Sequence, residues 1–426
     1  MKVVFKFSII SILLTTTINF PSKAEFAKNS KSKVTIIELN DNDNFRTLNT
    51  IRIKPPQIIK KTPLRFNTST YSTSRKQPGN IAQPNSLRPT NFGTYGFPHT
   101  TSLVQSKTKP LTTNSKHAIT SSKPYNAVGK VIAISGNTGL LCSGALIGKG
   151  IVSTAAHCVS DYGDKFYGGL ELDRVIFIPA ATSKSSSNKY GGPIGVWQGA
   201  KLYIPKCWTR GKCPDSGNVP NENDIAIFTL RKKGGRTPAQ RGAHYFNYGW
   251  NHPGFTNSSD PFGKITVKKR AHITTLGYPA HLGDKASNRG GAMIRTDSLT
   301  FINNEKSTSG VGTRFEQYYW GSSQSGGSSG SPLIINFGFK PNYDTRYKNP
   351  GKYSKENVVV GNISWSYGDH RIHVQGASPF ARNSTYEGKK YKDRAGRNWG
   401  GGNIGYLMRK ACGKGYDGGQ AKGLCR

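Results

Sequence analysis

The chain has 426 residues, and its 60 lysines and arginines outnumber its 22 aspartates and glutamates, giving a formal net charge of +38 at pH 7. After residue 24 no apolar stretch approaches the roughly 20 residues that a transmembrane helix needs, so the sequence excludes a helical membrane span there. The charge predicts attraction to acidic partners, but no recognisable nucleic-acid-binding module accompanies it.

The first 24 residues have the pattern of an export signal. Lys2 and Lys6 precede a short apolar run over 7–20, and Ser22 and Ala24 are the small residues expected at a cleavage site. We therefore expect residues 1–24 to be a signal peptide that is cleaved after Ala24. The mature protein is then predicted to be secreted, either to a periplasm or to the medium.

Residues 25–124 have a different composition. This region has no cysteine, few large apolar residues in any periodic pattern, and abundant Ser, Thr, Asn, Lys and Pro. Because such a segment buries too little apolar surface to offset its chain entropy, we expect it to be largely disordered. Its place between a signal peptide and a folded domain predicts a basic propeptide, with a plain linker as the alternative.

Short strand-like runs begin near residue 124 and recur with Gly, Pro and Asn between them. They cover 124–135, 140–147, 150–154, 175–180, 195–205, 224–230, 265–276, 292–301, 332–337 and 357–365, and a helical pattern follows at 404–411. Many short strands predict an all-β domain over 125–426. This length suits two barrels better than one small barrel.

The six cysteines fall into three pairs that are close in sequence. Cys142 is near Cys158, Cys207 near Cys213, and Cys412 near Cys425. In an exported protein an even set favours disulfides over metal ligation, and we expect this local pairing among the connectivities that six cysteines allow. No pair has C-x-x-C spacing, and His370 with His373 is an isolated pair, so we predict no metal and no cofactor.

Three segments carry residue types that together perform nucleophilic catalysis. His157 lies in Thr-Ala-Ala-His-Cys after an apolar run, Asp224 precedes an alternating apolar strand, and Ser329 lies in Gly-Ser-Ser-Gly-Ser-Pro. A histidine can take the proton of a serine hydroxyl, and a buried carboxylate can orient that histidine. Glu222 is a second candidate for the acid. The Ser/Gly run could also be a flexible linker, but strand-like sequence flanks it on both sides.

These motifs, in the order His, Asp, Ser and separated by 67 and 105 residues, resemble the chymotrypsin/trypsin-fold serine proteases over roughly residues 125–410. They are most similar to the bacterial V8-like (glutamyl endopeptidase-type) branch, because of the segments 275–279 and 358–365 and the Gly-Ser-Pro ending of the serine motif. The resemblance implies two six-stranded antiparallel β-barrels with the active site between them and a short C-terminal helix. It implies that His157 is the base, Asp224 orients it, Ser329 is the nucleophile, and the N–H groups of Gly327 and Ser329 form the oxyanion hole.

The resemblance also places a substrate pocket, formed by Ser323, Gln324, Ser364, Trp365 and Ser366. Trypsin-like pockets have an Asp at the position of Ser323, so cleavage after Lys or Arg is not expected. Glutamate-specific relatives have His and Thr or Ser at the positions of Ser364 and Gln324, so a strict glutamyl preference is not expected either. Ser366 replaces a common Gly and should narrow the pocket.

One further departure concerns activation. Animal relatives have an Asp immediately before the nucleophile, and the new N-terminus pairs with it after cleavage. This chain has Ser328 there, so we expect that switch to be absent.

We therefore predict a secreted serine endopeptidase that acts as a monomer on protein or peptide substrates through an acyl-enzyme intermediate. The alternative is a catalytically silent protein of the same fold. Such a protein would bind polyanions through its basic clusters, at Arg231–Lys233, 268–270 and 389–397.

Overall fold

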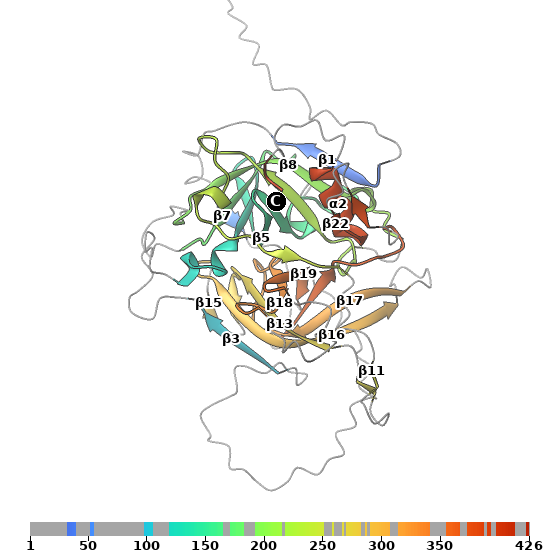
Figure 1. The fold of residues 1–426 in the computed structure, drawn as a ribbon. Coiled ribbons are helices and arrows are strands. Elements are labelled where there is room, and N and C mark those ends of the chain that lie inside the picture. The colour runs from blue at the N-terminus through green and yellow to red at the C-terminus, as the bar shows by residue number, and fades with distance from the viewer. Residues whose placement is uncertain are drawn as a thin grey trace, which may run out of the picture.

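The computed structural model describes residues 32–39, 52–54, 98–104, 119–164, 171–182, 192–214, 218–250, 258–259, 266–267, 270–282, 286–287, 290–306, 314–340, 355–366, 373–386, 390–392, 398–413 and 423–425. The predicted signal peptide with its cleavage point, and His370 of the histidine pair, lie outside these ranges. The described chain forms two curled β-sheets, one above the other in Figure 1.

The first sheet closes into a six-stranded antiparallel barrel. Its strands follow the order β8, β7, β4, β5, β6 and β9, and β9 pairs again with β8 to close the ring. The bounds are β4 (Val128–Ser135), β5 (Thr138–Gly148), β6 (Ile151–Thr154), β7 (Arg174–Pro179), β8 (Trp197–Pro205) and β9 (Ala226–Leu230).

The second sheet curls in the same way. Its order is β19, β18, β13, β16, β17 and β20, and β19 pairs with both β18 and β20. The bounds are β13 (Arg270–Gly277), β16 (Ile294–Lys306), β17 (Arg314–Gly321), β18 (Pro332–Ile335), β19 (Val358–Ser366) and β20 (Val374–Pro379). The predicted fold class, an all-β protein with two six-stranded sheets and a C-terminal helix, is confirmed.

Shorter elements complete the described chain. The strands are β1 (Val34–Glu38), β2 (Arg52–Lys54), β3 (His99–Leu103), β10 (Asn247–Tyr248), β11 (Ser258–Ser259), β12 (Thr266–Val267), β14 (His281–Leu282), β15 (Ala286–Ser287), β21 (Tyr391–Lys392) and β22 (Asn398–Gly400). The helices are α1 (Lys206–Thr209) and α2 (Gly402–Cys412), with 3-10 turns at Ile119–Ser121, Tyr125–Ala127, Ala156–Cys158 and Ala239–Arg241. The predicted helix over 404–411 lies within α2.

Both faces of the central strands are buried, which explains their continuous apolar sequence. In β4, Val131 and Ala133 belong to the interior cluster of the first barrel, whereas Val128 and Ile132 belong to a cluster shared with the second sheet and α2. Period-2 alternation thus sorts apolar residues between two cores instead of between core and water. The shared core fixes the two barrels against each other, and the catalytic candidates lie on loops along that contact.

The region before residue 125 contributes more order than its composition indicated. β1 pairs with β8, β2 with β5, and β3 with β16, so described parts of this region belong to both sheets. In Figure 1, β1 lies at the outer edge of the upper barrel and β3 at the lower edge of the other. The expectation of a largely disordered stretch is therefore incomplete, because three short strands within it gain partners that the local sequence does not reveal.

The six cysteines form three disulfides with the predicted local pairing. Cys142 bonds Cys158, Cys207 bonds Cys213, and Cys412 bonds Cys425. The last bond ties the end of α2 to residues 423–425, whose backbone contacts Lys149 and Gly150 between β5 and β6. No helix in the described part of the chain is long and apolar enough to cross a membrane.

Candidate active site

His157 is held in the 3-10 turn that follows β6. The disulfide of the next residue, Cys158, fixes this turn to Cys142 in the middle of β5. The imidazole is 16% exposed, so it reaches solvent from a turn whose backbone is otherwise enclosed. The neighbouring cysteine therefore restricts the histidine to a narrow range of positions.

Asp224 clamps this histidine at two points. Its Oδ2 accepts from imidazole Nδ1 at 2.7 Å, and its Oδ1 accepts from the His157 backbone N–H at 2.9 Å. The carboxylate is fully buried, and the imidazole beside it can balance its charge. With Nδ1 donating to the carboxylate, the lone pair of Nε2 is free to take a proton.

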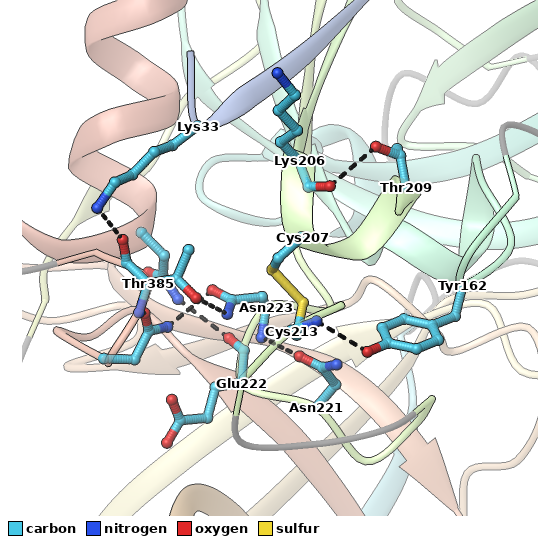
Figure 2. Close-up of a disulfide and its surroundings, with 12 residues drawn as sticks. Lys33, Tyr162, Lys206, Cys207, Thr209, Cys213, Asn221, Glu222, Asn223 and Thr385 are labelled. Atoms are coloured by element: carbon cyan, nitrogen blue, oxygen red, sulfur yellow. Dashed lines mark hydrogen bonds between the residues drawn. A yellow bond between two sulfur atoms is a disulfide. The ribbon is translucent and has the colours of Figure 1, made fainter. Parts of the chain in front are cut away.

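Glu222, the rival acid, lies apart from this contact. In Figure 2 its carboxylate points away from the Asn221–Asn223 backbone, and its own carbonyl accepts from Asn403 Nδ2 at 3.1 Å. Asn223 is held on the other side, where its amide donates to Thr385 Oγ1 and the amide of Asn383 donates to Asn223 Oδ1. These bonds fix the turn that presents Asp224 to the histidine.

Ser364 has a role that the sequence interpretation missed. Its hydroxyl donates to Asp224 Oδ2 at 2.5 Å and is buried, so its side chain contacts the acid. A charge-assisted hydrogen bond of this kind stabilises the ionised carboxylate. Position alone, one residue before Trp365, could not distinguish the two roles.

Ser329 lies in the loop between β17 and β18 and is 9% exposed. Its carbonyl accepts from the N–H of Ser143, the residue after Cys142, at 2.8 Å. The next residue, Gly330, packs against Thr154 and Ala155, where a side chain would collide with backbone that leads into the histidine turn. The serine is thus anchored to both strands that support His157.

The loop around Ser329 leaves two backbone N–H groups without acceptors in the described structure. Ser328, Gly330 and Ser331 donate theirs to carbonyls of Ser325, Ile363 and Ser328, whereas Gly327 and Ser329 make no such bond. The carbonyl before Gly327 is turned away and accepts from Ala280 N–H, which fixes the Gly327 N–H in the opposite direction. Gly327 has φ +95°, the left-handed region that favours glycine, and this orientation depends on it.

The structure does not join Ser329 to the imidazole. Among the described residues there is no hydrogen bond between its hydroxyl and His157, and Nε2 has Cys158 Sγ at 3.9 Å. Such bonds are often long before a substrate binds. The sulfurs of Cys142 and Cys158 also lie near the imidazole, but they are bonded to each other and cannot act as thiolate ligands to a metal.

Ser143 connects these parts, and sequence reasoning did not single it out. Besides its backbone bond to Ser329, its hydroxyl donates to the carbonyl of Gly327 at 2.8 Å and accepts from Tyr278 N–H at 2.9 Å. It is fully buried. The backbone and the side chain of this one residue therefore hold the carbonyls of Ser329 and Gly327, the two residues whose N–H groups are free.

Replacing Ser143 by Ala should slow acylation and destabilise the fold moderately. Loss of the hydroxyl leaves the buried Tyr278 N–H unpaired, at a cost of about 1–3 kcal/mol in the free energy of unfolding, and frees the Gly327 carbonyl. We expect the rate of fluorophosphonate labelling to fall at least about 10-fold, since the two N–H groups predicted to form the oxyanion hole would lose their alignment. Ser153→Ala is the matched control, because the hydroxyl of this buried serine donates to Asn362 of β19 and makes no described bond to the loop that carries Ser329. Equal labelling rates in the two variants would contradict the role of Ser143.

Lys130 of β4 lies opposite Ser143 in the sheet and is buried, with Nζ 5.4 Å from the centre of the Tyr278 ring. Burial lowers the pKa of this lysine to about 8. The folded state therefore binds fewer protons than the unfolded state between pH 8 and the ordinary lysine pKa. The free energy of unfolding should rise with pH over this window.

Between pH 8 and 10 the rise should be about 2 kcal/mol, measured by urea unfolding without reductant. Burial also raises the pKa of Tyr278, which lowers stability only above pH 10 and limits the window. In Lys130→Met the rise should be smaller by that amount. The same pH dependence in both proteins would show that the lysine titrates normally.

The remaining predicted pocket residues lie around the loop that carries Ser329. Ser323 Oγ is 3.0 Å from His99 Nε2, and the Gln324 amide donates to Thr296 Oγ1 at 3.0 Å. Trp365 lies flat over Gly376, where a side chain would collide with the indole, and its Nε1 donates to Gln317. Ser366 pairs with Gln375 at the β19–β20 edge.

Ser328 is buried in a neutral network. Its hydroxyl donates to the carbonyl of Ser325 at 2.6 Å and accepts from Gln375 Nε2 at 2.7 Å. No carboxylate is present at this position to bind an N-terminal ammonium group. The geometry therefore gives no support to an activation switch at Ser328.

Comparison with known proteins identifies the protein family to which this chain belongs. The model of the Trypsin family matches residues 115–383, well over half of the chain, and the chain belongs to this family of serine proteases. No curated protein matches it.

Among solved structures, the thermostable serine protease AL20 from an extremophilic microorganism is 19% identical over 60% of this chain and 92% of its own, with a TM-score of 0.41. The protease Anisep from Arthrobacter nicotinovorans is 19% identical over 61% and 92%, also at 0.41. A Glu endopeptidase is 15% identical over 62% and 88%, at 0.35. These similarities add nothing to the family match.

Proposed function

We propose that this chain is an exported serine endopeptidase that hydrolyses peptide bonds through Ser329, His157 and Asp224. The observation that carries the proposal is the double clamp of the buried Asp224 on His157, through Nδ1 and the backbone N–H. A clamp of this kind fixes the tautomer in which Nε2 accepts a proton. Three disulfides fit an oxidising compartment, in line with export.

In the proposed reaction, His157 Nε2 takes the proton of Ser329 as its Oγ attacks the substrate carbonyl. The N–H groups of Gly327 and Ser329 donate to the resulting oxyanion, and each such donor is typically worth roughly 3–4 kcal/mol. The imidazolium, stabilised by Asp224, then protonates the leaving amine. Water then attacks the acyl carbon while Nε2 takes its proton, and the imidazolium returns that proton to Ser329 Oγ as the carboxylic acid product leaves.

The pocket residues restrict the substrate class. Ser323 stands where trypsin-type pockets carry a carboxylate, so a Lys or Arg side chain at P1, the residue before the cleaved bond, would have no partner of opposite charge there. We propose that P1 is neither Lys nor Arg. We also propose that the chain belongs to the V8-like branch and that it acts as a monomer.

The predicted propeptide, residues 25–124, includes strands β1 and β3, which belong to the folded domain. Because β1 and β3 belong to the two sheets, we propose that signal cleavage after Ala24 leaves both strands in the active protein.

Polyanion binding also stays a prediction. In the described cluster at 231–233, Arg231 Nη2 donates to the carbonyl of Leu39 and Lys233 Nζ to that of Val196, so two of its cations also serve the fold.

A fluorophosphonate probe tests the proposed function. The purified secreted chain should gain one phosphonyl group on Ser329, located by mass spectrometry of peptides, and should cleave an unfolded protein substrate. Ser329→Ala should lose both activities, while Ser331→Ala, a serine two residues away in the same loop, should still be labelled. An unlabelled, inactive wild-type protein that binds heparin would instead support the silent polyanion-binding alternative.

A further inference from the structure

Strand β3 belongs to the stretch that composition assigned to a propeptide or linker, but it is a paired edge strand of the second barrel. It runs antiparallel to β16, with His99 opposite Ser298 and Thr101 opposite Thr296. Ser298 Oγ also donates to the carbonyl of Pro98 at 2.9 Å. His99 and Thr101 point to the same face of the strand because side chains alternate along it.

Both of these side chains lead to the predicted substrate pocket. His99 is 4% exposed and its Nε2 lies 3.0 Å from Ser323 Oγ. Its ring meets that of His373 edge to face at 6.1 Å, and the carbonyl of His373 accepts from Ser322 N–H, next to Ser323. Ser323 is therefore held directly by an N-terminal strand, and its neighbour Ser322 is held by His373, the residue before β20.

The second connection runs through Thr101. Its Oγ1 is 3.3 Å from Thr296 Oγ1, and Thr296 in turn accepts from the Gln324 side-chain amide at 3.0 Å. Gln324 donates to Thr275 as well and is buried. Alternate residues of one short strand thus support two consecutive residues of the predicted pocket.

We propose that His99 and Thr101 are positioning residues for P1 recognition, and that β3 forms the floor under Ser323 and Gln324. This inference rests on the proposed function of the same site. The floor offers hydroxyl, amide and imidazole groups and no carboxylate. Gln324 Oε1 is buried and has no hydrogen-bond partner in the described structure. An aliphatic P1 side chain would leave this oxygen unpaired, whereas one that ends in a hydrogen-bond donor would satisfy it.

The test compares P1 profiles of variants on the two faces of β3. Full-length His99→Ala, His99→Gln and Thr101→Val are compared with Ser102→Ala, whose side chain lies on the exposed face of the same strand. Each is measured for kcat/KM on a peptide library that varies only at P1. The rate of labelling by a small fluorophosphonate without a P1 side chain is measured in parallel.

In His99→Ala the ratio of kcat/KM for polar over aliphatic P1 residues should fall at least about 10-fold, with an unchanged labelling rate. His99→Gln should recover part of the ratio, because its amide can still bond Ser323. Thr101→Val, which keeps the side-chain shape, should shift the ratio less in the same direction, and Ser102→Ala should match wild type.

Two results separate failure of this inference from failure of the proposed function. A labelled wild type whose P1 ratio is unchanged in both His99→Ala and Thr101→Val overturns the role of β3 alone. A wild type that is neither labelled nor active overturns the proposed function and this inference with it.

Discussion

Asp224→Asn should reduce kcat by about 10⁴-fold, the loss that this change causes in serine-protease triads. KM should stay close to the wild-type value. Asp224 accepts three hydrogen bonds, from the His157 ring, the His157 backbone and the Ser364 hydroxyl. An amide has one acceptor oxygen, and this oxygen should face the His157 backbone N–H, which can only donate, so the amide nitrogen takes the place of Oδ2. The bond to Nδ1 then reverses or is lost, and the ring takes the tautomer in which Nε2 carries the proton.

Ser364→Ala is the control for this experiment. It removes one of the three donors but leaves the carboxylate and both histidine contacts in place, so kcat should fall only about 10-fold. Activity is measured on the best library peptide, and thermal unfolding shows that both variants are folded. If Ser364→Ala were as damaging as Asp224→Asn, the carboxylate would serve the packing of this region more than the tautomer of the histidine.

The sequence contained enough to predict the fold class and to select His157, Asp224 and Ser329 as the catalytic candidates. The apolar runs of β4 to β6 and of β18 to β19 lie next to the motifs, so local pattern and chemistry coincide there. The helix predicted over 404–411, just before Cys412, lies within α2. In each case the signal lies within a few residues of the feature.

The features that sequence could not predict depend on contacts between distant segments. Ser143 lies inside the quoted motif, but its hydroxyl bonds residues more than 130 positions away, at Tyr278 and Gly327. Ser364 was assigned to the pocket because its neighbours are, and only the fold shows that its hydroxyl turns to Asp224. Side-chain direction is set by tertiary packing, which no spacing rule encodes.

The N-terminal strands were missed for a related reason. β1 is a short β-branched run in a polar stretch, and an isolated strand of five residues has no stability of its own. It becomes ordered because β8 offers an unpaired edge, with Val34 opposite Pro205 and Glu38 opposite Lys201. Val34, Ile37 and Leu39 are buried as a result.

β1 is also tied to the loop that carries Asp224. Lys33 Nζ donates to the carbonyl of Thr385 at 2.7 Å, as Figure 2 shows, and Tyr386 donates its hydroxyl to the carbonyl of Lys33. The Thr385 side chain in turn accepts from Asn223, the residue before Asp224. Removal of β1 therefore frees one support of the active-site loop in addition to exposing apolar side chains.

A chain from which residues 25–104 are deleted, behind an intact signal peptide, should consequently be much less stable and nearly inactive. Burial of three apolar side chains contributes about 5 kcal/mol, so the melting temperature should drop by about 10 °C or more. The control deletes only 25–31 and keeps both strands, and it should behave as wild type. A deletion of 25–97, which keeps β3, should lose the stability that β1 provides while it retains the P1 profile.

The opposite result would restore the propeptide interpretation of the whole region. A removable propeptide leaves a stable enzyme behind, so the protein lacking 25–104 would then keep the melting temperature and the labelling rate of wild type. Intact mass of the naturally secreted protein gives an independent reading. Because β1 and β3 pair with strands of different barrels, we expect that mass to include both, with an N-terminus before residue 32.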